Sequence, residues 1–211
     1  MVEPTKKIQL QAPKEKTRTA ILEAARTVFS ENGYHNANVS DIIQKVGMAQ
    51  GSFYNYFPSK KSIFIELLEN FTQKLVDALE KYTVENASDR DTYSAMAIGI
   101  ASTVSIAFTE DAKLAKIFFW EANGIESDIT EILEKAYLKI TKITERFMLH
   151  GQKMGILRDD IPADVLAAAD VGISIHMIKE YLSGRLNQYS KEKLLFFNVG
   201  IQLGGMMKQK E

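Results

Sequence analysis

Hydrophobic residues recur at intervals of three and four along nearly the whole chain of 211 residues. Ile21, Ala25, Val28 and Phe29 set this spacing first, and they predict a helix over about residues 17–32. No segment alternates with the two-residue period of a half-buried strand. The pattern therefore predicts an all-α fold of nine helices, three short and six longer, over about residues 17–32, 39–46, 50–56, 59–84, 91–109, 112–123, 127–154, 163–183 and 190–207.

The first three predicted helices have the outline of a helix-turn-helix unit. Asn32-Gly33 ends the first helix, and Pro58 separates the third helix from the next. Gly47 stands in the turn between the second and third helices, where a residue often needs a positive φ that glycine adopts without a Cβ clash. This spacing predicts a helix-turn-helix motif at about residues 38–57.

The third short helix has two different faces. Phe53 and Phe57 are four residues apart, and we expect both to point into the core. The other face then carries short polar groups and two phenols but no acid, which suits a DNA recognition helix. Its residues are Gln50, Gly51, Ser52, Tyr54, Asn55 and Tyr56. A small helical subdomain with an ordinary polar face is the alternative interpretation.

Charge and composition narrow the classes of function. Residues 1–60 carry a formal charge of +3, whereas residues 61–211 carry −4. The N-terminal part is therefore the end expected to meet a polyanion. Hydrophobic residues make up 45% of the chain and charged residues 25%, which indicates a globular protein rather than a disordered, fibrous or low-complexity one.

The sequence shows no group of residues that would indicate an enzyme. Cysteine is absent, and the three histidines, His35, His150 and His176, are far apart. We therefore expect no metal site, no cofactor and no catalytic nucleophile. A helical protein-interaction adaptor without DNA binding stays open as an alternative. The N-terminus shows no apolar leader and residues 92–109 are interrupted by Ser and Thr, so we expect a cytoplasmic protein without a membrane span.

A longer stretch, about residues 15–70, resembles the N-terminal domain of the TetR family of transcriptional regulators. The resemblance rests on motifs at fixed spacing without gaps: Gly33-Tyr34, Val39-x-Asp41-Ile42, Gly47, Gly51-x-Phe53-Tyr54-x-Tyr56-Phe57 and Ser59-Lys60-Lys61. It implies a basic flexible arm at residues 1–16, a helix-turn-helix DNA-binding domain at 17–60, and a ligand-binding and dimerisation domain at 61–211.

The family pattern also implies roles for individual residues. Ser40 matches a position on the second helix that reaches DNA. Tyr54 and Tyr56 match aromatic residues that hold phosphates, and Lys60 matches a lysine that contacts a phosphate. The positions that resemble base-proximal ones are Gln50, Gly51, Ser52 and Asn55. The chain departs from the pattern at Ala49, where many members have a polar residue that can cap the recognition helix.

The resemblance implies that the C-terminal part dimerises and senses a ligand. The expected function is that of a repressor that leaves a pseudo-palindromic operator in double-stranded DNA when a small lipophilic effector binds. Gly200 and Gly204 lie on one face of the last helix and permit close helix approach. We therefore expect the last two helices to form the homodimer interface, with packing inside a single chain as the alternative.

A dense aromatic patch at residues 118–121 marks the expected ligand pocket. Polar residues within apolar stretches, such as Asp170 and His176, would need a partner or a ligand there. The predicted ligand-binding residues are Met96, Phe119, Trp120, Glu121, Asp170, His176 and Met177. An aromatic or methionine stripe at helical spacing is more often core than ligand site, and this alternative stays open.

Overall fold

The computed structural model describes residues 5–122 and 127–208, with side chains from Lys14 onward apart from that of Glu121. Nine α-helices lie in these ranges, which confirms the predicted all-α class. Within the same ranges, extended pairing is limited to an isolated antiparallel bridge between Leu157 and Met207.

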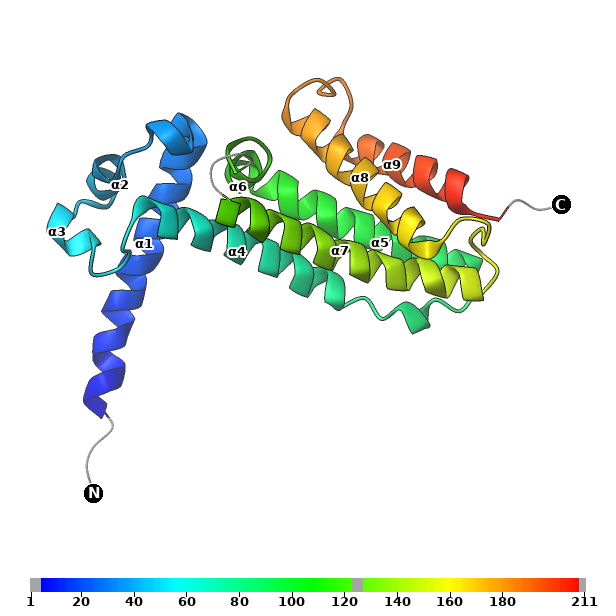
Figure 1. The fold of residues 1–211 in the computed structure, drawn as a ribbon, viewed down its shortest axis with the longest axis horizontal. Coiled ribbons are helices and arrows are strands. Elements are labelled where there is room, and N and C mark those ends of the chain that lie inside the picture. The colour runs from blue at the N-terminus through cyan, green and yellow to red at the C-terminus, as the bar shows by residue number, and fades with distance from the viewer. Residues whose placement is uncertain (1–4, 123–126, 209–211) are drawn as a thin grey trace.

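A small unit forms one end of the molecule and leads through one long helix into a bundle (Figure 1). It consists of α1 (Thr5–Asn36), α2 (Val39–Val46), α3 (Gln50–Phe53) and the start of α4 (Lys60–Glu80). α1 begins at Thr5, well before the predicted start near Thr17. α3 is shorter than predicted, since a turn replaces its expected last residues up to Tyr56.

The longer part of the molecule is a helical bundle (Figure 1). It continues from α4 through η1 (Val84–Asn86), α5 (Arg90–Glu110), α6 (Ala112–Lys116), η2 (Ile117–Glu121), α7 (Ser127–Lys153), α8 (Ala163–Leu182) and α9 (Lys191–Met206). η2 is a π-helix, so the single helix predicted after residue 112 is divided in two. The side chains of Ser59, Asp89 and Ser190 accept hydrogen bonds from backbone N–H groups in the first turns of α4, α5 and α9, which fixes where these helices begin.

α4 contributes to two separate hydrophobic clusters. Near its start it gives Ile63 to the cluster that holds α1, α2 and α3 together. Further along it gives Leu75 and Leu79 to a cluster inside the bundle. Ile117 of η2 also belongs to the N-terminal cluster. The domain boundary predicted near residue 60 thus falls at the beginning of a continuous helix that joins two cores.

By length and composition alone, α5 is the one helix in the described ranges that could cross a membrane, with a mean hydropathy of 1.3 over a window of 18 residues. The expectation that residues 92–109 do not span a membrane stays a prediction. In the structure α5 packs against α4, α8 and α9. Tyr93, Ile100 and Phe108 line a large cavity in the bundle, and this role accounts for the apolar composition of the helix.

Candidate DNA-binding surface and ligand cavity

The turn between α2 and α3 fixes how α3 is presented. Gly47 ends α2 with a φ of 75° and a ψ of 36°, a left-handed conformation that is easy for glycine and strained for other residues. Phe53 is completely buried and Phe57 nearly so. Arg18 of α1 covers Phe57, with its guanidinium carbon 4.6 Å from the ring centroid. Two buried rings therefore hold α3 to the core and leave its other face at the surface.

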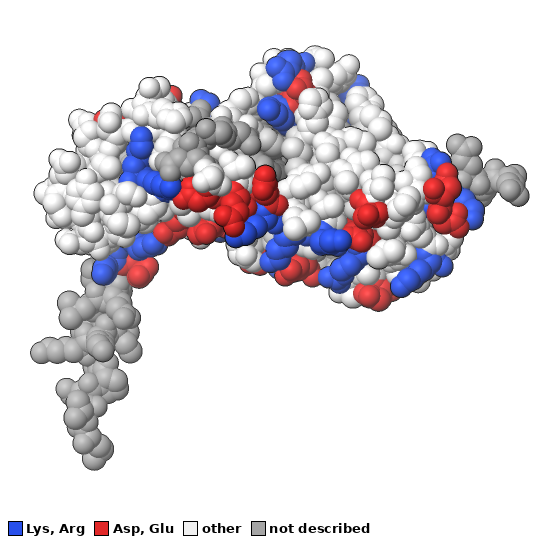
Figure 2. All heavy atoms as spheres, viewed as in Figure 1, with Lys and Arg blue, Asp and Glu red and all other residues white. Residues whose placement is uncertain are grey.

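The residues predicted to contact DNA lie at the surface of α2, α3 and the turn that follows. Tyr54 is 53% exposed and Tyr56 is half-buried. The other exposed ones are Ser40, Gln50, Gly51, Ser52 and Asn55. No residue from Gly47 to Pro58 is charged, and Figure 2 shows the N-terminal unit as largely uncharged on the face in view. This surface can offer hydroxyl and amide groups to bases and phosphates without a repelling carboxylate.

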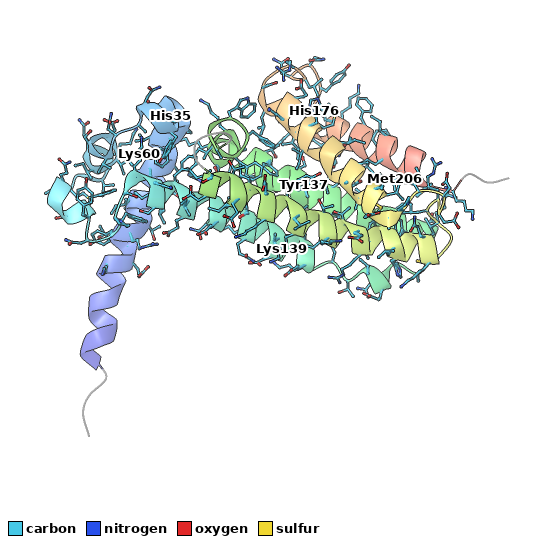
Figure 3. The ribbon with its side chains drawn as sticks, viewed as in Figure 1. His35, Lys60, Tyr137, Lys139, His176 and Met206 are labelled. Carbon is cyan, nitrogen blue, oxygen red and sulfur yellow. The ribbon has the colours of Figure 1, made fainter. Side chains whose placement is uncertain are left out.

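Lys60 is placed differently from a lysine that is free to contact a phosphate. Its ammonium donates hydrogen bonds to the carbonyl oxygens of Tyr34 at 2.6 Å and Ala37 at 2.8 Å, and the His35 carbonyl oxygen lies at 3.4 Å. Figure 3 shows Lys60 and His35 close together within the N-terminal unit. Partial burial lowers the pKa of Lys60. These contacts link the start of α4 to the end of α1.

The bundle contains a cavity of about 450 Å³, a volume within the range of small-molecule sites. Residues of α4, α5, η2, α7, α8 and α9 line it, and most of them are aliphatic or aromatic. Two of the predicted ligand-binding residues, Phe119 and Asp170, are in its wall. Phe118 lines it as well, and the Phe118 and Phe119 rings pack on Phe108 at centroid distances of 5.4 and 5.0 Å.

His176 and Trp120 do not line this cavity. His176 projects from α8 with 71% of its side chain exposed (Figure 3). Each residue of an α-helix turns by about 100°, so His176 lies about 240° around α8 from Asp170, away from the cavity. Trp120 is 39% exposed and packs edge-on against Phe119 at 5.7 Å. Trp120 therefore touches the cavity wall from outside.

The other predicted ligand-binding residues are also placed elsewhere. Met96 packs against the cluster around the C-terminal end of α7 and the start of α8. Met177 borders two other depressions beside α8 and α9. The side chain of Glu121 lies outside the described residues. The structure thus brings together only part of the predicted ligand set.

Sequence reasoning did not single out three polar residues that line the cavity. These are Tyr93 of α5, Ser174 of α8 and Gln202 of α9. The Tyr93 hydroxyl donates a hydrogen bond to the Phe147 carbonyl oxygen at 3.1 Å. Ser174 is four residues after Asp170, on the same face of α8, so helical spacing from Asp170 would have identified it. No pattern in the sequence around Gln202 indicated that it lines the cavity.

One acidic group dominates the electrostatics of the cavity wall. Burial raises the pKa of the Asp170 carboxyl to about 6, because a carboxylate is disfavoured where water is excluded. Burial also raises the pKa of Tyr93, and the nearby Asp170 charge raises it further. Among the described residues, none donates a hydrogen bond to the Asp170 carboxylate or forms an ion pair with it.

α6 and η2 connect the cavity to the N-terminal unit. Ile117 is buried in the core beneath α1, whereas Phe119, two residues later, lines the cavity. Arg26 of α1 forms an ion pair with Asp111 at the start of α6. A ligand that displaces this segment would therefore change its packing against α1 as well as the cavity wall.

The outer faces of α8 and α9 are unusually apolar for a surface. Val165 is 53%, Ile201 59% and Phe196 74% exposed. A Cβ added at Gly200 or Gly204 would meet no other atom within 4 Å. Neither glycine is therefore required by packing inside the described part of one chain, and exposed apolar patches of this kind mark interaction surfaces.

The family described as "Bacterial regulatory proteins, tetR family" matches residues 21–67. This range contains α2, α3 and the beginning of α4. Over 169 residues the chain is 30% identical to the HTH-type transcriptional regulator YdgC of Bacillus subtilis (strain 168), an alignment that covers 79% of this chain and 81% of YdgC.

Two solved structures share the fold. The regulator FadR of Bacillus subtilis, in complex with stearoyl-CoA, has a TM-score of 0.76 at 19% identity, and the match covers 89% of this chain and 98% of that one. A transcriptional regulator from Saccharomonospora viridis, in complex with choline, has a TM-score of 0.73 at 19% identity, with 92% and 100% covered. At these identities the likeness establishes the arrangement of helices.

Proposed function

The chain belongs to the TetR family of bacterial regulatory proteins and is a DNA-binding transcriptional regulator, and from this premise we propose that it represses transcription until a small ligand enters the bundle cavity. In this proposal two copies of the chain bind a pseudo-palindromic operator, and the ligand lowers their affinity for it. Because the chain belongs to this family, the alternative of a helical protein-interaction adaptor without DNA binding is no longer needed. The relatives compared above are transcriptional regulators rather than enzymes.

The observation that carries the DNA side of the proposal is the uncharged outer face of α3, held by Phe53 and Phe57. Gln50 of α3 and Asn55 of the turn that follows are exposed there, and their amide groups can pair with adenine in the major groove. Tyr54 is exposed beside them and is proposed to contact a phosphate. Since Lys60 is occupied by carbonyls of α1, we assign it the positioning of α4 rather than a DNA contact.

The ligand side of the proposal rests on the cavity. Its volume of about 450 Å³ and its mostly aliphatic and aromatic wall suit a small molecule with a large apolar part. The two structural neighbours hold stearoyl-CoA and choline, which carry opposite charges. The fold therefore accommodates ligands of either charge, and the residues of this cavity must decide which one is bound.

Coupling between the two sites is proposed to run through α4 and η2. Leu75 and Leu79 of α4 line the cavity, and Lys60 at the other end of α4 is bonded to α1. A ligand that moves α4 or η2 would change the separation of the two recognition helices in a dimer. Half-sites of a pseudo-palindrome are about 34–36 Å apart or a multiple of that, so a small change in separation weakens binding.

Assembly is proposed to use the apolar faces of α8 and α9. Phe196 and Ile201 would be covered by a second copy, and Gly200 and Gly204 would let the two α9 helices approach closely. Two such helix pairs related by a two-fold axis form a four-helix bundle.

Selection of bound fragments from randomised duplex DNA, followed by mobility-shift titration, tests the proposal. We expect a palindromic consensus, and we expect Gln50→Ala or Asn55→Ala to change which sequences are selected. Glu131→Gln, on an exposed face of α7, is the matched control and should select the wild-type consensus. If both the Gln50→Ala and the Asn55→Ala proteins select the wild-type consensus, α3 and the turn after it do not read the DNA sequence.

A further inference from the structure

Charged groups are few in the wall of the cavity. Three charged residues line it, namely Glu134, Asp170 and Lys179. Glu134 is exposed to solvent, whereas Asp170 and Lys179 are half-buried. Burial raises the pKa of the Asp170 carboxyl. The cavity therefore presents the carboxylate of Asp170 to whatever occupies it.

Three hydrogen-bond donors around Asp170 are directed to other acceptors. The Gln202 amide donates to the main-chain oxygen of Asp170 at 3.0 Å and to the Ser174 hydroxyl oxygen at 2.9 Å. Asn198 donates to the same hydroxyl oxygen at 3.1 Å. The Tyr93 hydroxyl donates to the main chain of α7. The described protein thus leaves the carboxylate of Asp170 without a donor, although it surrounds the residue with polar groups.

Lys179 cannot neutralise Asp170. It lies nine residues further along α8, which is about 13 Å at the helical rise of about 1.5 Å per residue. Its ammonium is instead 5.9 Å from the centroid of the Trp120 ring. A half-buried carboxylate without a partner is unfavourable unless a positive group pairs with it.

We propose, on the basis of the proposed ligand-responsive function, that the effector is an amphipathic organic cation whose positively charged nitrogen pairs with Asp170. Its apolar body occupies the space bounded by Phe108, Phe119 and Leu75. An anionic amphipath of the same size would bring a second negative charge next to Asp170 and would be repelled. The cavity accordingly selects both the charge and the hydrophobicity of its ligand.

This pairing makes binding depend on pH. The carboxylate must be ionised to attract the cation, so affinity should fall as pH decreases through about 6, by up to about tenfold per unit. The titratable or charged groups that share the cavity wall with Asp170 are Tyr82 after α4, Tyr93 of α5, Glu134 and Tyr137 of α7, and Lys179 of α8, whereas α4, η2 and α9 contribute none. The Asp170→Asn variant separates the effect of Asp170 from that of the other groups.

Calorimetric titration of the full chain with three probes of equal chain length tests the inference. The probes are decyltrimethylammonium, decanoate and decanol, each below its micelle-forming concentration, at about pH 8. We expect the wild type to bind decyltrimethylammonium at least about tenfold more tightly than the other two. Asp170→Asn should lose at least about tenfold in affinity for the cation and change by less than about twofold for decanol. Asp164→Asn removes an exposed carboxylate from the same helix and should leave all three affinities unchanged.

The possible failures are distinguishable. If decanol or decanoate binds the wild type as tightly as the cation does, or if Asp170→Asn keeps the cation preference, the inference is wrong and the proposed ligand-responsive function stands. If none of the three probes binds, the cavity is not a ligand site, and the proposed function loses its ligand side together with this inference.

Discussion

The Lys60 ammonium donates a hydrogen bond to the Tyr34 carbonyl oxygen at 2.6 Å and lies 4.5 Å from the centroid of the Tyr34 ring. The contact joins the first residue of α4 to the end of α1, and Ala37 accepts a second bond from the same ammonium. Lys60→Met would leave these carbonyls without a charged donor. We expect the free energy of unfolding to fall by about 1–3 kcal/mol, measured by urea denaturation.

The control for this variant is Lys74→Met, which changes an exposed lysine on the same helix. Its unfolding free energy should stay within about 0.5 kcal/mol of the wild type. A Lys60→Met protein that is as stable as wild type but binds every DNA sequence more weakly would instead assign Lys60 to a phosphate contact.

Gly51 offers a separate test of how closely DNA approaches α3. It is exposed, and a Cβ added there would meet no protein atom within 4 Å. Gly51→Ala should therefore leave the stability unchanged or raise it by up to about 1 kcal/mol, because alanine favours helix. If the backbone of α3 approaches DNA closely at this point, affinity for the selected operator should fall about tenfold or more. Wild-type affinity in a mobility-shift titration would place Gly51 away from the DNA.

Gly204→Leu tests the proposed dimer interface. Because nothing in the described chain lies within 4 Å of a Cβ at this position, the larger side chain fits in a single copy. We expect sedimentation to show a shift from dimer to monomer at micromolar concentration, and operator affinity to fall with it. Lys74→Leu adds the same side chain to an exposed site on α4 and should sediment as the wild type does. If the Gly204→Leu protein stays fully dimeric, the dimer interface does not include this part of α9.

Much of the helical framework could be predicted because local signals decide it. Ser59, Asp89 and Ser190 cap their helices through short-range hydrogen bonds, and Gly47 ends α2 for a reason internal to its own backbone. α2 begins and ends at the residues that the pattern predicts. Such features depend on neighbours within four residues, which the sequence displays directly.

The ligand site was harder to predict because it depends on the phase of each helix. Asp170 and His176 lie in the same apolar stretch, yet a difference of six residues turns one toward the cavity and the other toward solvent. The π-helix η2 changes the phase again, so Phe118 and Phe119 line the cavity and Trp120 does not. The contacts of Lys60 join segments more than twenty residues apart, a separation at which spacing carries no information.

Asp170 should make stability depend on pH. Its pKa in the folded protein, about 6, is above the ordinary value of 3.8, so the folded state holds the proton more tightly than the unfolded state does. Stability should therefore decrease as pH rises from about 4 to about 6, by up to about 3 kcal/mol. Asp170→Asn should unfold at a higher temperature than the wild type at pH 8, and the difference should shrink toward zero near pH 4.

Asp164→Asn provides the comparison for this measurement, because Asp164 is exposed on the same helix. Its unfolding temperature should follow that of the wild type at every pH. If Asp170→Asn lowers the unfolding temperature at pH 8, then a group of the folded protein already stabilises the ionised Asp170. A ligand would then not be needed to pair with it.

The claim on which the account depends most is that occupancy of the cavity controls DNA binding. Operator affinity measured with and without saturating decyltrimethylammonium, in the wild type and in Asp170→Asn, tests it most directly. The variant also controls for any effect of the cation on DNA itself. The account predicts that the cation weakens wild-type affinity by about 5–150-fold and that Asp170→Asn largely loses this response. An unchanged wild-type operator affinity, while calorimetry shows the cavity saturated, would contradict the account.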